Sequence, residues 1–515
     1  MNKNSYLASV LLAGSLFFGN LSVQAQDRTI KLTTQKPAGE AVTLLVNYTY
    51  KGVTVDWGDG QPVAYNTGKE PIREITGTVK GSTITITGDG NWNMLSCADC
   101  GLTDIDLTGA RDFASLYCQN NQLTTLDIKG MKELTDLDCS NNQIARFSFS
   151  GATATSEIPK LENLNISNNQ FTGTFNYPLP SLKTLNISNN QFTGALLTSN
   201  TGLVSLQCEG NKLGGLAVDK APNLTALVCS NNNIANLLLS KTATEIRQLV
   251  ADNNRISVTL DLSAYSNLAD LSVSNNVITK LYLPENKLRS LNLSNNKLTF
   301  NVLPVYAYRP KYLTFMPQEK LDISKFENVK TVNGQPTMTV VTWENRGKNT
   351  LDLSPYIKIA VKPNGTGGTN DGIIEWFELT EDNKEIPLVK YVNSTQTPND
   401  YFVNSNKFNF FTPHERVFAR IRPNNIYGDT DHFIETTCIA IMADPTTGIG
   451  NIAGTDNGLS ISSTRGSLTI SAPSAMAVRV ISADGKTVWN GTVSSAVTIT
   501  LPGGIYIVNG KKVVL

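Results

Sequence analysis

The middle of the chain repeats one short pattern in constant phase, and this repeat limits the possible folds more than any other feature. Nine segments share the form apolar-x-apolar-x-x-Asn-x-apolar, and a tenth, LSCADCGL at 95–102, fits the same frame with Cys in place of Asn. The nine are LYCQNNQL (116–123), LDCSNNQI (137–144), LNISNNQF (164–171), LNISNNQF (185–192), LQCEGNKL (206–213), LVCSNNNI (227–234), LVADNNRI (249–256), LSVSNNVI (271–278) and LNLSNNKL (291–298). Successive pattern asparagines are mostly 21 or 22 residues apart. A phase kept over so long a stretch predicts a stack of structurally equivalent coils.

This period and pattern are those of the leucine-rich repeat, with about ten units between residues 92 and 301. Each apolar-x-apolar segment predicts a short strand, and the strands of successive coils are expected to pair in parallel. One coil cannot bury its apolar side alone, so neighbouring coils supply the core. At a strand spacing of about 4.8 Å, ten coils extend roughly 45–50 Å.

The recurring asparagines are expected to be structural. A carboxamide both donates and accepts, so it can satisfy the backbone where each coil turns inward. The asparagines are Asn121, Asn142, Asn169, Asn190, Asn211, Asn232, Asn254, Asn276 and Asn296. The residue before them is often a second Asn, which tolerates a left-handed turn.

The cysteines fall within the same frame. Cys97, Cys118, Cys139, Cys208 and Cys229 occupy the core position two residues after the strand Leu, and Cys100 occupies the Asn position. The Cys97-x-x-Cys100 spacing also fits a redox or zinc site, but free Cys behaves as a small buried hydrophobe. Parallel neighbours lie about 4.8 Å apart, too far for the roughly 3.8 Å between disulfide Cβ atoms. We therefore predict structural thiols.

This cysteine ladder resembles internalin-J-like leucine-rich repeat proteins over roughly residues 92–300. The resemblance implies a surface protein with repeats of the 21-residue kind, in which Cys replaces a core Leu. The two LNISNNQFTG units, at 164–173 and 185–194, depart from it because they lack the Cys, and the solenoid is expected to change curvature there.

The N-terminus predicts export. Lys3, the apolar run Leu7–Phe18 and Val23-Gln24-Ala25 form a signal peptide over 1–25, with an apolar run too short for a membrane anchor. Alternating segments over 26–91 predict a β cap on the solenoid, since an open end would expose a strand edge. Gly58-Asp59-Gly60 is typical of a hairpin. Asp56 and Asp59 are the alternative calcium ligands, but no further run of oxygen ligands follows.

Residues 302–445 contain β runs separated by turns, which predicts an antiparallel, immunoglobulin-like sandwich with Trp376 as its buried strand Trp. The two histidines, His414 and His432, match no metal-ligand spacing and are interpreted as surface or loop residues. A linker follows at 446–457. The fold class is therefore mainly β, with short irregular or helical convex segments and two flanking sandwiches.

The last segment, residues 458–515, resembles the C-terminal sorting domain of the type IX secretion system of the Bacteroidota. The matching residues are Ala483-Asp484-Gly485-Lys486, the run from Leu501 through Gly504 and Tyr506 to Val508, and the basic Lys511-Lys512. The resemblance implies contact with the type IX secretion machinery, removal of this domain, and attachment of the mature protein to the outer membrane or its release. The alternative is an ordinary small β domain.

The composition excludes some classes of function. Lys plus Arg equals Asp plus Glu, so the formal net charge is zero, which argues against nucleic acid as a partner. No later segment is long enough to span a membrane. No nucleophile, zinc-protease or phosphate-loop motif is present, so we expect no enzyme and no cofactor. A glycan hydrolase in the sandwich is the least favoured alternative.

The predicted function is adhesion, through binding of a host or bacterial surface protein or glycan on the concave strand face. A self-associating structural component of biofilms is the alternative. Solvent-facing positions are expected to flank the core Cys or Ile, in one row from Ser96 to Asn292 and a second row from Gln119 to Ser294. Within these rows the ligand-binding residues are predicted to be Tyr117, Asp138, Gln207, Glu209 and Asp252.

Overall fold

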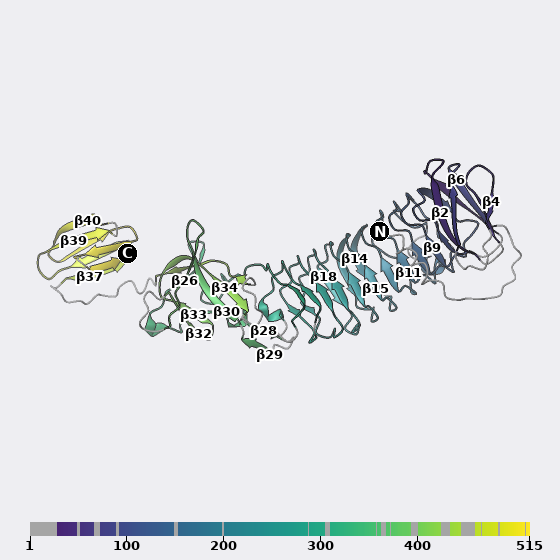
Figure 1. The fold of residues 1–515 in the computed structure, drawn as a ribbon. Helices are drawn as coiled ribbons and strands as arrows, with labels where there is room; N and C mark the ends of the chain where they lie inside the picture. The colour runs from purple at the N-terminus through teal and green to yellow at the C-terminus, as the bar shows by residue number, and fades with distance from the viewer. Residues whose placement is uncertain are drawn as a thin grey trace. The chain divides into compact units, whose positions relative to one another are not determined.

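The structure is a computed structural model of the 515-residue chain, shown in Figure 1. It describes residues 28–48, 52–65, 73–88, 92–148, 153–197, 200–286, 288–303, 309–356, 358–361, 367–370, 372–392, 400–423, 433–443, 459–464, 466–482, 485–509 and 511–515. The predicted signal peptide (1–25), the predicted linker (446–457), His432 and the Ala483-Asp484 pair of the sorting motif lie outside these residues. The chain divides into two compact units, residues 1–318 with 359–368, and residues 319–358 with 369–515. Each is described by itself.

The first unit is a leucine-rich repeat solenoid, as predicted. Its strands stack side by side along the solenoid (Figure 1), and each pattern Leu lies level with the Leu of the next coil, as Leu137 does with Leu164. The described residues include eleven parallel strands: β7 (Trp92–Ser96), β9 (Ser115–Tyr117), β10 (Asp136–Asp138), β11 (Asn163–Asn165), β13 (Thr184–Asn186), β15 (Ser205–Gln207), β17 (Ala226–Val228), β19 (Gln248–Val250), β21 (Asp270–Ser272), β23 (Ser290–Asn292) and β24 (Tyr312–Thr314).

The pattern asparagines form a continuous ladder of buried amides. In the coil of Asn142, Oδ1 accepts from the backbone N–H of Leu123 at 2.9 Å, and Nδ2 donates to the carbonyl oxygens of Cys118 and Cys139 at 3.0 and 3.1 Å. The amide therefore joins its own coil to the preceding one. The same arrangement recurs at the other eight pattern asparagines.

The solenoid continues one coil beyond the predicted end at residue 301. Strand β24 pairs with β23 in parallel, with Leu313 level with Leu291. Gln318 takes the place of the ladder Asn, because its Oε1 accepts from Leu298 N at 2.9 Å and its Nε2 donates to Leu293 O at 2.8 Å. A Gln does not fit the Asn pattern, so the sequence frame missed this coil.

The convex side carries a second sheet that begins at the Phe-Thr-Gly units. It is formed by β12 (Thr172–Gly173), β14 (Gln191–Leu197), β16 (Lys212–Val218) and β18 (Asn236–Leu239), and further on β20 (Leu260–Asp261) pairs with β22 (Leu281–Tyr282). The short helices are α2 (Ala154–Glu157) and η2 (Phe300–Val302).

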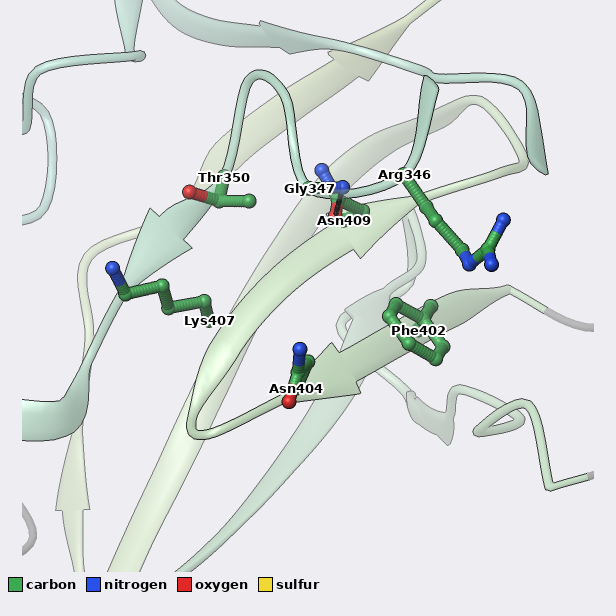
Figure 2. Close-up of a pocket in the computed structure, with 7 residues that line it drawn as sticks. All are labelled: Arg346, Gly347, Thr350, Phe402, Asn404, Lys407 and Asn409. Carbon is green, nitrogen blue, oxygen red and sulfur yellow. Dashed lines mark hydrogen bonds between the residues drawn. The ribbon is translucent and has the colours of Figure 1, made fainter. Parts of the chain in front are cut away.

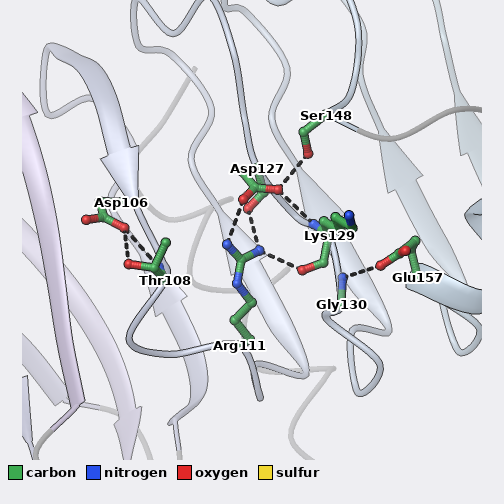
Figure 3. A network of polar contacts seen from close by, with 8 residues as sticks. All are labelled: Asp106, Thr108, Arg111, Asp127, Lys129, Gly130, Ser148 and Glu157. Carbon is green, nitrogen blue, oxygen red and sulfur yellow. Dashed lines mark hydrogen bonds and ion pairs between the residues drawn. The ribbon is translucent and has the colours of Figure 1, made fainter.

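A polar network joins the insertion around α2 to the neighbouring coils (Figure 3). Arg111 donates to the Asp127 carboxylate and to Lys129 O, both at 2.6 Å, and Gly130 N donates to Glu157 Oε2 at 2.7 Å. Burial raises the pKa of Asp127, but the hydrogen bonds from Arg111 and Ser148 outweigh it and lower the pKa to about 2. The network therefore links the loops of neighbouring coils through side-chain hydrogen bonds.

The N-terminal residues cap the solenoid. Strand β2 (Ala41–Tyr48) pairs antiparallel with β7 on one side and with β5 (Arg73–Thr78) on the other, so the first parallel strand has no open edge. A second sheet has the order β4-β3-β6-β1-β8, formed by β4 (Val63–Tyr65), β3 (Val53–Asp56), β6 (Thr83–Gly88), β1 (Arg28–Thr34) and β8 (Leu102–Asp106).

The predicted hairpin joins β3 to β4, and its acidic residues have structural partners. Asp56 Oδ1 accepts from the backbone N–H groups of Gly58, Asp59 and Gly60 at 2.9–3.1 Å. Asp59 accepts from Lys80 Nζ at 2.6 Å. Gly58 has φ +108°, and an added Cβ would lie 2.5 Å from Gly81 N, so only glycine fits there. Both carboxylates therefore accept hydrogen bonds that hold the hairpin.

The sandwich of the second unit has two sheets around one core. The larger has the order β25-β26-β36-β34-β30-β31, with β35 paired to β34, and the smaller has the order β27-β33-β32. Trp376 is buried between them as predicted, in edge contact with Phe410 at 4.9 Å. The strands are β25 (Lys330–Val332), β26 (Gln335–Thr339), β27 (Leu351–Asp352), β30 (Gly372–Leu379), β31 (Glu385–Pro387), β32 (Tyr401–Asn404), β33 (Lys407–Phe410), β34 (His414–Pro423), β35 (Ile434–Glu435) and β36 (Ile439–Met442), with single 3-10 turns at η4 (Trp343–Asn345) and η5 (Ser354–Tyr356). Strand β28 (Lys358–Val361) pairs with β29 (Gly367–Asn370) in a separate sheet, most of which belongs to the first unit.

The sandwich is not wholly antiparallel. Strand β26, near the start of the domain, pairs in parallel with β36, near its end. Such a pair needs a long connection, and here almost the whole domain lies between the two strands.

The C-terminal segment folds as a small β-sandwich with its own core. One sheet contains β37 (Ser460–Thr464), β38 (Ser467–Ser471) and β41 (Ala496–Thr500), and the other contains β40 (Thr487–Val493), β39 (Met476–Ser482), β42 (Ile505–Val508) and β43 (Lys511–Val514). Tyr506 is 6% exposed in this core, and its hydroxyl donates to Pro502 O at 2.9 Å. Gly504 pairs with Leu515 through two backbone hydrogen bonds. Lys511 and Lys512 lie in β43.

Candidate functional site

The candidate site is the outward face of the parallel sheet of the solenoid, which we call the sheet face. Side chains alternate along a strand, so the residues on either side of each buried Leu point outward. The row after the Leu was predicted and is at least partly exposed from Tyr117 onward. Ser96, the first member predicted, is only 8% exposed, because β2 pairs beside it.

The second predicted row is mostly buried, which corrects the sequence analysis. Its serines and Gln119 are 2–8% exposed, and only Glu209 and Asp252 are half-buried. These residues lie where each coil turns inward, and several serine hydroxyls donate to the strand residue two positions earlier, as Ser167 does to Asn165 at 2.8 Å. The buried members are Gln119, Ser140, Ser167, Ser188, Ser230, Ser274 and Ser294.

The row before the Leu was missed. Its members share the outward direction of the predicted row, and two-residue alternation around the Leu was the signal that could have identified them. They are Asp136, Asn163, Thr184, Ser205, Ala226, Gln248, Asp270, Ser290 and Tyr312.

Of the five predicted binding residues, Tyr117, Asp138 and Gln207 lie on the sheet face, whereas Glu209 and Asp252 follow the strands, and the five do not form one cluster. Tyr117 lies level with Asp138 on adjacent strands. Gln207 is three strands further along, which corresponds to about 14 Å. Asp252 follows β19, two strands beyond Gln207, at about 10 Å.

The carboxylates of the two predicted aspartates accept hydrogen bonds from other residues of the solenoid. Asp138 Oδ1 accepts from Ser140 N and Oγ at 2.9 and 2.6 Å, and its Oδ2 accepts from Asn165 Nδ2 at 3.0 Å. Asp252 accepts from Ser272 Oγ and from Ser274 N and Oγ at 2.6–2.8 Å. Each carboxylate therefore connects its own coil to the next one by hydrogen bonds.

Tyr117 and Glu209 are partly enclosed. Burial, with the nearby charges of Asp136 and Asp138, raises the pKa of Tyr117. The Oε2 atom of Glu209 is buried, and within the described residues it has no hydrogen-bond partner. Neither residue extends freely from the sheet.

In the middle of the sheet face, several outward side chains make no side-chain hydrogen bond to the rest of the described solenoid. Gln207, Ala226, Val228, Gln248 and Val250, which we call the central patch, lie on the adjacent strands β15, β17 and β19. Gln207 and Gln248 are exposed, and within the described residues their side chains make no hydrogen bond. Gln207, Val228 and Val250 lie level with one another.

The rim of the central patch adds one apolar and one charged residue. Val204 directly precedes β15 and is 37% exposed. Arg247 directly precedes β19, is exposed, and has no ion pair among the described residues. By contrast, Lys183 and Arg289 on the same rim are paired with Glu162 and Asp270. Within the part of the chain that the structure describes, the central patch and its rim thus combine an apolar centre, amides without hydrogen bonds and one cation without an ion pair.

The ladder cysteines are buried thiols. All seven cysteines of the chain lie in described residues, and none forms a disulfide. Burial raises the pKa of Cys97 and Cys118 well above the usual value and that of Cys100 to about 12. Because the thiolate is the nucleophile and the metal ligand, these side chains are chemically inert.

His414 differs from its prediction as a surface or loop residue. It lies in β34 with its side chain 10% exposed, and Nε2 is 2.8 Å from Thr412 Oγ1. The carboxylates of Glu378 and Asp400 are 3.2 and 3.6 Å from its ring nitrogens. The described residues contain no group of three or more His, Cys, Asp or Glu side chains placed to hold a metal. Nor do they include a helix with the length and apolar character needed to cross a membrane.

Comparison with known proteins gives the repeat family and several solved structures. The Leucine Rich Repeat family matches residues 160–180, 181–203 and 287–306 and names no catalytic activity. The functional domain of InlJ from Listeria monocytogenes, described as including a cysteine ladder, aligns at 18% identity over 70% of this chain and 93% of that one, with a TM-score of 0.30. No curated protein sequence matches the chain.

Two further structures share the repeat. The plant peptide hormone receptor RGFR1 in complex with RGF2 aligns at 20% identity with a TM-score of 0.32, over 42% of this chain and 41% of the receptor chain. The leucine-rich effector protein YopM from Yersinia pestis aligns at 23% identity over 40% of this chain and 72% of that one, with a TM-score of 0.30. The chain therefore spans less than half of the plant receptor.

Proposed function

We propose that the solenoid binds a protein partner through its sheet face, and that the chain acts at the cell surface as an adhesin. The observation that carries this proposal is the central patch. Its apolar pair, Val228 and Val250, is flanked by the unengaged amides of Gln207 and Gln248. An apolar centre with a polar surround is the usual anatomy of a protein interface.

The dimensions of the sheet face set a condition on the partner. Eleven strands about 4.8 Å apart and about 10 Å long present roughly 480 Å². A stable interface buries about 800 Å² on each side. A partner must therefore also contact the rim, where Val204 and Arg247 are available.

We propose further that residues 1–25 direct export and that residues 458–515 are a type IX sorting domain. The basis is the sequence resemblance together with the separate core of the C-terminal sandwich. Gly504 and Tyr506 have structural tasks in that sandwich, so their presence alone does not distinguish sorting from folding. The mature surface protein would then contain the solenoid and the larger sandwich.

The test is binding of the mature protein to host cells, matrix proteins and partner bacteria. We expect saturable binding that falls at least tenfold in Val228→Lys, because a charge at the centre of an interface must be desolvated without a partner. The matched control is Lys212→Glu, on the exposed side of convex strand β16, which should bind normally.

A Tyr117→Ala variant separates the central patch from the site predicted by sequence. Loss of binding in Tyr117→Ala but not in Val228→Lys would move the site to the N-terminal coils. Binding unchanged in both would remove the sheet face from consideration. Concentration-dependent oligomers with no saturable binding would instead support the structural biofilm component.

A further inference from the structure

A pocket of about 430 Å³ lies on the outer face of the smaller sheet of the larger sandwich (Figure 2). Strands β32 and β33 pair so that Phe402 lies level with Asn409, and Asn404 with Lys407. These four side chains line the pocket from the sheet. Tyr401, Val403, Phe408 and Phe410 alternate with them and belong to the core. The volume is within the range of about 300–1,000 Å³ typical of small-molecule sites.

The wall of the pocket is a loop that is fixed in place. Arg346, Gly347 and Thr350 line the pocket from this loop (Figure 2). Asn409 is 1% exposed, accepts from Gly347 N at 2.9 Å, and donates to Lys348 O at 2.6 Å. Asn349 Nδ2 donates to Thr339 O at 2.9 Å. The pocket is therefore formed before any ligand arrives, which lowers the entropic cost of binding.

Aromatic rings border the pocket. Phe402 lines it, and its ring centroid is 5.5 Å from that of Trp343. Trp343 is 39% exposed and also contacts Tyr391 and Phe411, at 4.5 and 6.0 Å between centroids. A large exposed Trp supported by three other rings is a rigid apolar platform of the kind found at binding hot spots.

The charged groups of the pocket are cations. Arg346 and Lys407 are both exposed, and none of the seven described lining residues is acidic. The Arg346 guanidinium lies 4.1 Å over the Trp343 ring, and Nη1 donates to Trp343 O at 2.8 Å, which orients the group. Among the described residues, Lys407 has one ion-pair partner, Asp352, at 3.6 Å. The pocket therefore favours an anion.

We propose that this pocket binds an acidic sugar residue of a polysaccharide. The carboxylate or sulfate would pair with Arg346 and Lys407, since a guanidinium matches such groups with two parallel hydrogen bonds. The Asn404 amide and Thr350 hydroxyl can donate to and accept from sugar hydroxyls. The apolar C–H face of a sugar ring would pack on Phe402.

The same cations could attract an acidic peptide, but the pocket fits one less well. An extended peptide gains its affinity from backbone hydrogen bonds along a sheet edge. The residues here lie on the face of the sheet, and the edge of β32 is already partly paired, with Lys390 bridged to Tyr401. A compact ring with hydroxyls and one negative group uses every feature of the pocket.

The test titrates the full mature chain with oligosaccharides by calorimetry. The acidic probes are a galacturonate trisaccharide, a hyaluronan tetrasaccharide, a heparin tetrasaccharide and sialyllactose. The neutral probes are a galactose trisaccharide, which lacks only the carboxylates of the first probe, and lactose. We expect at least one acidic probe to bind, both neutral probes to bind at least tenfold more weakly than that probe, and added salt to weaken binding.

Arg346→Gln and Lys407→Gln should each reduce this binding about tenfold, since each removes a charge-assisted hydrogen bond. The matched control is Lys384→Gln, an exposed lysine of the same domain paired with Asp382, which should change nothing. All three side chains are exposed, so folding should be unaffected, and circular dichroism checks this. Phe402→Leu should weaken every bound probe.

Three results would overturn the proposal. The first is that no acidic probe binds. The second is that binding is equal in Arg346→Gln, Lys407→Gln and the parent chain. The third is that a hexaglutamate peptide binds this pocket while the oligosaccharides do not, which would make it a peptide site. Sheet-face variants such as Val228→Lys should leave saccharide binding intact. The experiment therefore tests the pocket separately from the proposed binding surface of the solenoid.

Discussion

At the scale of single residues, two adjacent asparagines perform different tasks in eight of the nine coils that carry the pattern Asn, and in the ninth Gly210 precedes Asn211. The second, such as Asn142, is buried and bonds to two coils. The first, such as Asn141, is exposed and has φ +54°. A left-handed backbone is disfavoured for most residues but tolerated by Asn. The pair therefore combines one hydrogen-bonding requirement with one conformational requirement.

The two tasks predict unequal mutational costs. Asn142→Ala leaves the Leu123 N–H buried without a partner, which should lower the free energy of unfolding by about 1–3 kcal/mol. Asn141→Gly keeps access to positive φ and should change it by no more than about 0.5 kcal/mol. Urea unfolding followed by circular dichroism measures both. Equal losses in the two variants would contradict the division of tasks.

At the scale of elements, the cysteines form short rows inside the parallel sheet. Cys97, Cys118 and Cys139 stack in consecutive coils, and Cys208 and Cys229 stack further along. Burial raises the pKa of these thiols, to about 12 for Cys229. The unfolded chain has an ordinary thiol pKa near 9.0, so it loses protons at a lower pH than the folded chain. Stability from this source is complete below about pH 9 and is lost as the pH rises toward the folded pKa.

The buried thiols predict that the folding stability of the solenoid falls at alkaline pH. Between pH 9 and pH 11 the folded solenoid should lose about 1 kcal/mol per buried thiol for each pH unit. A Cys118→Ala/Cys139→Ala variant is less stable at pH 7 because of the cavities, but its stability should fall less steeply with pH. Chemical unfolding of both proteins at pH 8, 9 and 10 measures the slopes, and ionisation of Lys and Tyr is common to both. Identical slopes would count against buried protonated thiols.

At the scale of the whole molecule, the C-terminal sandwich is separable from the solenoid. Its core is formed by its own residues, among them Leu468, Ile470 and Val480. Deletion of residues 459–515 should therefore leave the melting temperature of the solenoid within about 2 °C. In the native host, the deletion should abolish surface display, as measured by protease accessibility and antibody labelling of intact cells. Surface display that survives the deletion would show that this domain is not the sorting signal.

The sequence predicts only part of the two candidate binding surfaces. The pattern predicts an outward row from Ser96 to Asn292, which is exposed only from Tyr117 onward, and it predicts Asp138 and Asp252 as binding residues. Nothing in the repeat pattern shows that their carboxylates accept from Ser140 and from Ser272 and Ser274. The central patch is recognised only once these internal bonds are known. The sandwich pocket was not foreseen, because Arg346 and Phe402 are far apart in the chain.

The sequence by itself determined the solenoid: its period, its buried Leu and Cys positions and its Asn ladder. In a stack of coils each unit contacts only its neighbours, so a repeated local pattern specifies the whole array. The tertiary structure alone decided where the array ends, through Gln318, which side chains remain free to bind, and how β32, β33 and the loop at 346–350 form a pocket. These features depend on hydrogen bonds and strand pairings between residues distant in sequence, and a local pattern does not encode them.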